Sequence, residues 1–263
     1  MMQMDHKAFN GNSCDLRGKN IIVSGGSSGI GRQCALECSK AGARVHVLGR
    51  DEARLEEVFC QMSGEGNSRH SLDMRDTEQF LAVVDGIVKS FGKITGFIHS
   101  AGYQITSPVK AMSASQYRDI FLVNTISGFE LGRIISMKKN HVTGELSIIF
   151  IAGGISVIGV TALTAYGASK AGLVGGARAM AVELAPRKIC VNCVSPGYIV
   201  DTNMLGDLDQ TLSEEELSRL SQGYPLGLGH TGEISAMCAY LLSDKARWIT
   251  GQNIVVDGGA TAQ

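Results

Sequence analysis

The stretch SGGSSGIG, Ser24 to Gly31, decides the fold of this 263-residue chain. The apolar run before it, Asn20 to Ser24 (NIIVS), predicts a buried strand, and the residues after it turn into a helix. A glycine-rich turn in this setting binds a dinucleotide pyrophosphate, because the helix N-terminus offers unpaired N–H groups and a positive dipole end. Gly25 permits the tight turn, Gly29 lets the backbone approach the pyrophosphate, and Gly31 allows close helix packing. The residues assigned to this part of a cofactor site are Gly25, Ser27, Ser28, Gly29 and Ile30.

The rest of the chain alternates short apolar runs with longer amphipathic ones. The expected strands are 20–24, 44–48, 69–72, 95–99, 147–151, 189–194 and 253–256. Later helices are expected at 51–62, 76–91, 115–139 in one or two pieces, 164–184, 213–221 and 232–242. Continuous apolar strands separated by helices indicate a parallel sheet covered on both faces. With right-handed crossovers, the sequence predicts an α/β fold with a doubly wound, seven-stranded parallel sheet, which binds ligands at the carboxyl ends of its strands.

Composition limits the number of domains and the classes of partner. No repeat or linker divides the chain, so we expect one domain, residues 16–263, after an N-terminal extension, residues 1–15. The net charge of −1 and the lack of a basic block argue against nucleic acid or an anionic membrane as partner. The extension lacks the apolar core of a signal peptide. The uncharged run 146–169 is long enough to span a bilayer, but its Gly, Ser and Thr content favours a strand, a loop and a helix start.

The seven cysteines follow no spacing typical of a metal site, so no metal is expected. Cys190 and Cys193 are either a CxxC redox pair or two residues of one strand. Side chains three apart on a strand point to opposite faces, which favours the second interpretation. Cys34 and Cys38 share one helix face, as small core residues do. We therefore expect a reducing, cytoplasmic environment.

The end of the second strand selects the cofactor. An acidic residue there binds a ribose 2′-hydroxyl, whereas a basic residue accommodates a 2′-phosphate. In RVHVLGRDE, Gly49 stands where the acid is expected and Arg50 follows it, while Asp51 and Glu52 suit the first turn of a helix. Arg50 could alternatively be a solvated surface charge. The missing acid favours NADP(H) over NAD(H).

Two further strand ends are candidate parts of the site. Asp73, after the third strand, either contacts adenine or caps the next helix. In HSAG, the small residues Ala101 and Gly102 would let a ribose or a nicotinamide approach the backbone. His99 could be an acid–base group, but no carboxylate lies beside it in the sequence, which favours a packed histidine.

Tyr166 and Lys170 are four residues apart and share one face of the helix expected from 164. A nearby ammonium favours the phenolate, so we expect the Tyr166 pKa to fall. The tyrosine could then donate or accept the proton that accompanies hydride transfer at a carbonyl or an alcohol.

The ordered set SGGSSGIG, HSAG, VNT, YGASK, SPGY and VDGG resembles the short-chain dehydrogenase/reductase family from about Leu16 to Gly259, most of all its ketoacyl-carrier-protein reductase-like branch. The resemblance implies a single-domain Rossmann fold, a nicotinamide cofactor, and hydride transfer to or from a ketone or secondary alcohol. The substrate would be a small or carrier-linked molecule. A homodimer or homotetramer is also implied, with ITGQNIVVDGG at a common contact.

The resemblance assigns roles to single residues. Tyr166 matches the acid–base residue, Lys170 the lysine that also holds the nicotinamide ribose, and Asn124 the asparagine that supports a proton-relay water. Pro196 and Gly197 match the loop beside the nicotinamide. The cofactor residues that complete this loop are Ile199 and, across an apparent one-residue insertion, Thr202.

Substrate choice in the family comes largely from the segment after SPG, here about 200–225. Its leucines form an apolar lid or simply pack the segment down; they are Leu205, Leu208, Leu212, Leu217 and Leu220.

One expected part is missing. The family has a serine thirteen residues before the tyrosine, which hydrogen-bonds the substrate oxygen, and this chain has Gly153 there. Ser156 either turns its hydroxyl inward as a substitute or is an ordinary polar loop residue, and the second reading is favoured. Gly153 therefore supports an alternative function, a nucleotide-binding protein with little turnover and a binding or assembly role. The retained Tyr166, Lys170 and Asn124 favour an NADP(H)-dependent oxidoreductase.

Overall fold

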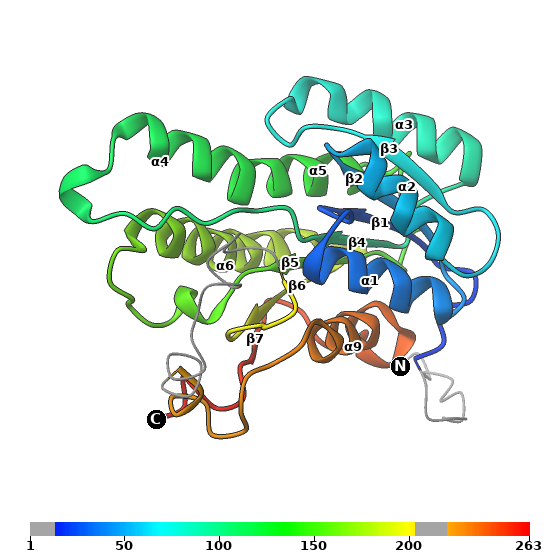
Figure 1. The fold of residues 1–263 in the computed structure, drawn as a ribbon. Coiled ribbons are helices and arrows are strands. Elements are labelled where there is room, and N and C mark those ends of the chain that lie inside the picture. Colours follow the sequence, from blue (N-terminus) through cyan, green and yellow to red (C-terminus); the bar gives the residue numbers. More distant parts are fainter. Residues whose placement is uncertain (1–13, 203–219) are drawn as a thin grey trace.

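Seven parallel strands form one sheet in the computed structural model, which describes residues 14–202 and 220–263 (Figure 1). The strand order is β3-β2-β1-β4-β5-β6-β7, so the order reverses between β1 and β4. The strands are β1 Asn20–Ser24, β2 Arg44–Gly49, β3 Ser68–Ser71, β4 Gly96–His99, β5 Ser147–Ile151, β6 Cys190–Pro196 and β7 Asn253–Val256. The predicted doubly wound sheet is confirmed.

Helices cover both faces of this sheet because the central strands are apolar on both sides. On one face α3, α5 and α6 pack on β4 and β5 around Phe97, Leu131 and Phe150. On the other face α1, α2 and α9 pack around Val45, Ile98 and Cys238. Within the described residues, the helices are α1 Gly29–Lys40, α2 Glu52–Gln61, α3 Phe80–Phe91, α4 Ala114–Phe121, α5 Ser127–Ile135, α6 Thr164–Leu184 and α9 Thr231–Leu242.

The expected elements match these bounds closely, with two differences. Residues 77–79 form a 3₁₀ turn before α3, and the helical region expected over 115–139 contains a π-helical turn, Leu122–Ile126, between α4 and α5. A π turn inserts one residue into the helix, and hydrophobic periodicity does not reveal it. The extension expected over 1–15 lies almost wholly outside the described residues, as do most of the helix expected at 213–221 and the leucines of 205–217.

The cysteines are packed as expected. Cys34 and Cys38 are buried between α1 and α9, and Cys190 and Cys193 are free thiols in β6. Cys190 Sγ points to Arg247 O and Cys193 Sγ to Leu173 O, on different elements, so the redox pair is not formed. Over residues 14–202 and 220–263, no helix is both long and apolar enough to cross a bilayer.

His46 of β2 joins the first residues of β1 and β3 through hydrogen bonds between side chains. His46 Nε2 lies 2.6 Å from Asn20 Oδ1, and His46 Nδ1 lies 2.6 Å from Ser68 Oγ. Asn20 Nδ2 in turn donates to Gly92 O at 2.9 Å. Burial lowers the pKa of His46 to about 3, and burial likewise lowers the pKa of His99 to about 3.

These neutral histidines make the fold sensitive to acid. An unfolded histidine takes up a proton near its ordinary pKa of 6.5, whereas the folded rings do not until about 3. Their contribution is therefore complete above pH 6.5 and is lost as the pH falls towards 3. At about 1.4 kcal/mol per pH unit, each ring should lower the free energy of unfolding by about 2 kcal/mol at about pH 5. Urea unfolding of the native protein and of His46→Gln, near neutral pH and at about pH 5, measures this. The native protein should lose more free energy of unfolding on acidification than the variant, and an equal loss in both would contradict the prediction.

Candidate active site

One pocket of about 580 Å³ opens at the carboxyl ends of the strands, where the strand order reverses. Every residue assigned to the cofactor from the sequence lines this pocket. Tyr166 and Lys170 line it as well, whereas Asn124 is fully buried just behind its wall. The structure therefore brings the sequence-predicted residues together from six separate segments.

The glycine turn between β1 and α1 is shaped to take a group close to its backbone. Gly25 has φ +70°, and a Cβ there would lie 2.6 Å from the Ala101 backbone. A Cβ at Gly31 would clash with Gly25 O. The N-cap residue Ser28 makes no capping hydrogen bond with its side chain, so the first N–H groups of α1 are not satisfied by that residue. This geometry fits a pyrophosphate on the helix N-terminus.

Ser27 and Arg50 flank the end of β2. A Cβ at Gly49 would lie 3.1 Å from Ser27 Oγ, which leaves little room for an acidic side chain at that position. Arg50 lines the pocket with two thirds of its side chain exposed, and its Nη1 lies 4.0 Å from Asp73 Oδ2. Asp73 Oδ1 accepts the Arg75 N–H at 2.9 Å, so Asp73 both holds its own turn and faces the pocket. The N-cap of the next helical turn is Asp76, so Asp73 does not cap it, and a contact of Asp73 with adenine stays a prediction.

A charged network next to Asp73 was not predicted from the sequence. Arg75 binds Asp119 of α4 through two hydrogen bonds, at 2.8 and 2.9 Å, and lies over the Tyr103 ring. The Tyr103 hydroxyl also donates to Asp119, and these contacts hold the pKa of Asp119 down to about 2. The network fixes the loop after β4 to α4. Its members are far apart in the sequence, so no local spacing indicates it.

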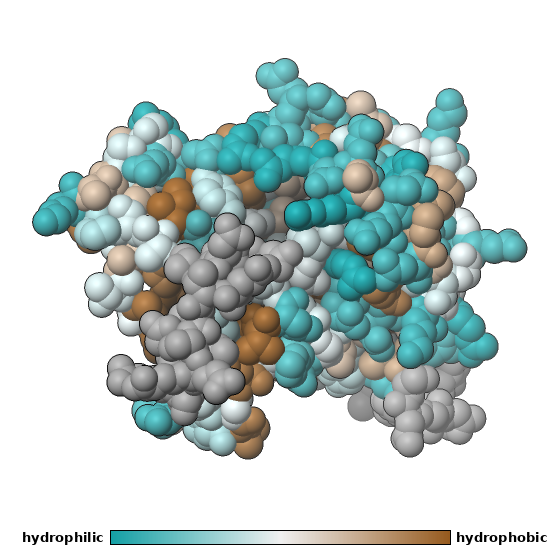
Figure 2. All heavy atoms as spheres, viewed as in Figure 1, coloured by the Kyte–Doolittle hydropathy of each residue, from teal (hydrophilic) through white to brown (hydrophobic). Residues whose placement is uncertain are grey.

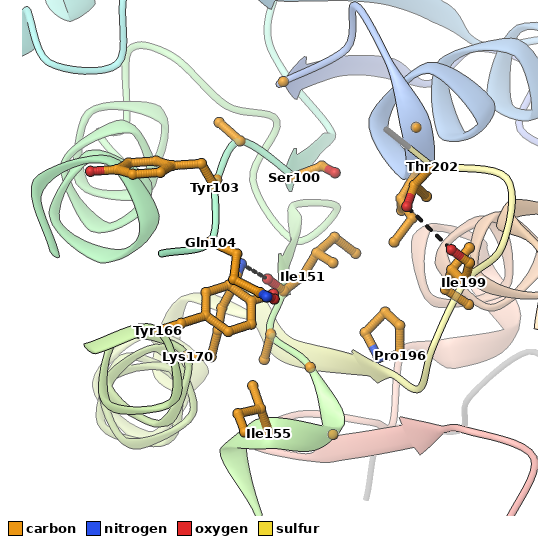
Figure 3. A pocket seen from close by; sticks show the side chains of 18 of the residues that line it. Ser100, Tyr103, Gln104, Ile151, Ile155, Tyr166, Lys170, Pro196, Ile199 and Thr202 are labelled. Atoms are coloured by element: carbon orange, nitrogen blue, oxygen red, sulfur yellow. Dashed lines mark hydrogen bonds between the residues drawn. The ribbon is translucent and has the colours of Figure 1, made fainter. Parts of the chain in front are cut away.

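Tyr166 and Lys170 lie on one face of α6, towards the pocket. Lys170 Nζ donates to Ile151 O at 2.9 Å and lies 5.8 Å from the centre of the Tyr166 ring (Figure 3). Burial lowers the pKa of Lys170 to about 8 and raises that of Tyr166 to about 12. The expected fall of the Tyr166 pKa is therefore wrong for this structure. The phenol hydroxyl is removed from water, and this outweighs the ammonium at that distance.

Asn124 sits in the π-helical turn and joins two other segments. Its Nδ2 donates to Tyr103 O and to Ser169 Oγ, both at 3.0 Å, and its Oδ1 accepts the Tyr103 N–H at 2.9 Å. Ser169 Oγ donates in turn to Tyr166 O at 2.7 Å. The π turn aims this side chain at the β4 loop, and sequence reasoning found neither the turn nor Ser169.

The loop after β6 closes the end of the pocket that lies beside the glycine turn, which we call the cofactor end. Thr202 Oγ1 donates to Ile199 O at 3.2 Å, and its methyl group lies 3.5 Å from where a Cβ at Gly29 would be (Figure 3). Pro196 and Gly197 line the same wall. The structure thus places Thr202 beside the glycine turn in spite of the longer loop.

Gly153 faces the Tyr166 hydroxyl. A Cβ added there would lie 3.9 Å from Tyr166 Oη and 3.5 Å from Ile155, which are ordinary contacts, and the backbone is extended. The Ser156 hydroxyl lies 3.3 Å from Ser195 Oγ on β6, and Ser156 does not line the pocket. Ser156 is therefore a polar loop residue, which is the interpretation that the sequence favoured.

His99 is a packed strand-end histidine. Its Nδ1 lies 2.8 Å from Ser24 Oγ, its ring meets Phe150 edge-on, and a Cβ at Gly128 would be 2.6 Å from it. It is fully buried and does not reach the pocket, as the sequence had favoured.

The half of the pocket next to Tyr166 is apolar. Its lining side chains include Ile155, Ile158, Val160 and Leu163. Ile158 and Val160 are about half exposed at its mouth. On the face in Figure 2, hydrophilic side chains dominate over α1 to α3, and brown apolar groups gather on the side of α4 and α6. This half suits an uncharged ligand.

The chain is similar to known oxidoreductases over nearly its whole length. The sequence profile of a family described as enoyl-(acyl carrier protein) reductase matches residues 25–261. A 3-oxoacyl-[acyl-carrier-protein] reductase of Escherichia coli is 31% identical over 249 residues, which cover 93% of this chain and 98% of that protein. A tropinone reductase homologue of Arabidopsis thaliana is 30% identical over 250 residues, covering 94% and 91%.

Solved structures agree with these relatives. A short-chain dehydrogenase/reductase variant of Serratia marcescens superposes with a TM-score of 0.86 at 28% identity, covering 94% of this chain and 99% of that one. A dehydrogenase/reductase of Sinorhizobium meliloti gives 0.83 at 26% identity, covering 94% and 97%.

Proposed function

The chain belongs to the short-chain dehydrogenase/reductase family, as the sequence motifs predicted, and is accordingly an NAD(P)-dependent oxidoreductase of CH–OH and C=O groups. On that premise we propose that it reduces an uncharged ketone with NADPH, or oxidises the matching secondary alcohol, with Tyr166 as its acid–base residue. The observation that carries the proposal is the placement of Tyr166 and Lys170. Both line the apolar half of the pocket whose other half holds the glycine turn.

Each of the pocket residues has its own role in the proposed ketone reduction. When bound, the nicotinamide supplies the hydride for the carbonyl carbon. Tyr166, kept protonated at neutral pH by its raised pKa, donates its hydroxyl proton to the carbonyl oxygen. Lys170, with a pKa near 8, stays largely charged at neutral pH and stabilises the phenolate that forms. Asn124 holds the loop above them in place.

The preference for NADP(H) is proposed from Arg50 and Ser27. Both line the pocket at the end of β2, where a 2′-phosphate would lie, and Gly49 leaves little room for the acid that a free 2′-hydroxyl would need. Arg50 would bind the phosphate through charge-assisted hydrogen bonds.

The remaining proposals concern substrate size, assembly and compartment. The apolar half accepts a small or carrier-linked carbonyl or alcohol. Val182 of α6 and Trp248 before β7 are 78% and 92% exposed, and β7 is the last strand in the sheet order, which supports a homodimer or homotetramer. Seven free thiols support the cytoplasm.

The alternative is a nucleotide-binding protein with little turnover, because Gly153 supplies no hydroxyl beside Tyr166. A screen of uncharged ketones (cyclohexanone, acetophenone and ethyl acetoacetate) and their alcohols, with the reduced and oxidised forms of both cofactors, separates the two. Cofactor oxidation by at least one ketone supports the enzyme. Binding of NADPH without turnover of any probe supports the alternative.

Arg50 should set the cofactor preference. We expect Arg50→Ala to lose about 1.5–3 kcal/mol of NADPH binding, roughly tenfold or more in Kd, with NADH binding unchanged. Arg54→Ala is the matched control, because Arg54 pairs with Asp51 on α2 and does not line the pocket. Equal NADPH and NADH affinities by fluorescence titration, unchanged in Arg50→Ala, would refute the preference.

Tyr166 should be needed for turnover and not for cofactor binding. Tyr166→Phe keeps the ring packing and removes the proton, so we expect kcat to fall at least 10²-fold with the NADPH Kd within about twofold. Lys170→Ala should impair both. Tyr117→Phe is the control, since Tyr117 packs against the same cluster and does not line the pocket. Normal turnover by Tyr166→Phe would show that the site is misassigned.

A further inference from the structure

In the proposed reaction Tyr166 is one hydrogen-bond donor to the substrate oxygen, and the described residues offer few others. Gly153 has no side chain, and the Ser156 hydroxyl is directed at Ser195. Ser195 Oγ itself donates to Asn253 at 2.6 Å, so this group belongs to the contact between β6 and β7.

Other polar side chains of the pocket either make hydrogen bonds of their own or lie on another part of its wall. The Tyr103 hydroxyl donates to Asp119, and Thr261 hydrogen-bonds Asp257. The Tyr224 hydroxyl accepts the Tyr198 N–H at 3.2 Å, and its ring lies against Gly197 on the wall after β6. Ser100 lies against the glycine turn, with its hydroxyl directed away from Tyr166 in Figure 3. Ser27, Ser28 and Thr202 lie at the cofactor end.

Gln104 is placed differently. It lines the pocket from the loop after β4, and in Figure 3 its side chain points into the pocket on the side of Tyr166. Its Nε2 donates to Thr106 Oγ1 at 3.0 Å. A primary amide carries two N–H donors, so this bond leaves the second N–H for a ligand.

The backbone on both sides of Gln104 is held against Tyr166. Tyr103 is fixed by two hydrogen bonds between its backbone and the Asn124 side chain. Tyr103 and Ile105 both pack against the cluster of Ile120, Ala165 and Tyr166. The loop cannot move away from α6 without breaking these contacts, so the backbone that carries Gln104 is held in position before a ligand binds.

We propose that Gln104 is a catalytic residue whose side-chain N–H donates to the substrate oxygen, in the role for which Gly153 has no group. The inference rests on the proposed function. No covalent step is involved: the amide N–H binds the carbonyl oxygen as negative charge develops there, and Tyr166 delivers the proton. A donor from the β4 loop also explains how the site could work with glycine after β5.

The test is a set of variants assayed with NADPH and the ketone that the native protein reduces fastest in the panel. Gln104→Met keeps the length of the side chain and removes both donors, and we expect kcat to fall about 10²-fold with the NADPH Kd within about twofold. Adding Gly153→Ser should recover most of this loss, because a Cβ at 153 fits and lies 3.9 Å from Tyr166 Oη. In a protein that keeps Gln104, Gly153→Ser alone should change kcat much less. Ser156→Ala is the control and should change nothing.

Each outcome decides the inference. A kcat of Gln104→Met within about threefold of native, or a loss that Gly153→Ser does not recover, overturns it. Should Gln104→Met fold poorly by its melting temperature, Gln104→Leu provides the same test, since it has neither a donor nor a charge. If Tyr166→Phe is inactive while Gln104→Met is normal, the inference fails and the proposed function stands. If the native protein reduces no ketone, or Tyr166→Phe is fully active, the proposed function fails and the inference with it.

Discussion

The hydrogen bonds of the Asn124 side chain join the three segments that form the chemical end of the pocket. Both its amide atoms bind the backbone of Tyr103, and its Nδ2 also reaches Ser169 on α6. The side chain is fully buried, so a partner lost here leaves a polar group without water, at about 1–3 kcal/mol. The π-helical turn directs Asn124 at the loop, and through it the positions of Gln104 and Tyr166 are linked. The geometry of the site therefore depends on one residue that does not line the pocket.

Burial acts in opposite directions on the two titratable groups of the site. It stabilises the neutral phenol of Tyr166 and destabilises the ammonium of Lys170, since the charged form of each is removed from water. A protonated tyrosine beside a lysine that is still largely charged suits a proton donor for ketone reduction at neutral pH. Ile155 and Leu163, which pack against the cluster that contains Tyr166, also line this half of the pocket and make it suitable for an uncharged ligand.

Local patterns predicted the fold and most of the residues that line the pocket, because most of them follow a strand. The glycine turn, Arg50, Asp73 and the HSAG loop all fall at strand ends, and parallel strands bring those ends to one edge of the sheet. Contacts between distant segments were missed: Arg75 with Asp119, and Ser169 with Asn124. The direction of the Tyr166 pKa was also wrong, because sequence spacing shows the nearby lysine and not the extent of burial.

The central claim is that Tyr166 donates a proton while a charged Lys170 supports it. The most direct test is the rate of a single turnover with the fastest ketone at saturating NADPH, measured from about pH 6 to about pH 10. The account predicts a constant rate at low pH and a fall as Lys170 loses its proton near pH 8, well below the pKa of about 12 of Tyr166. A rate that stays level over the whole range would contradict it.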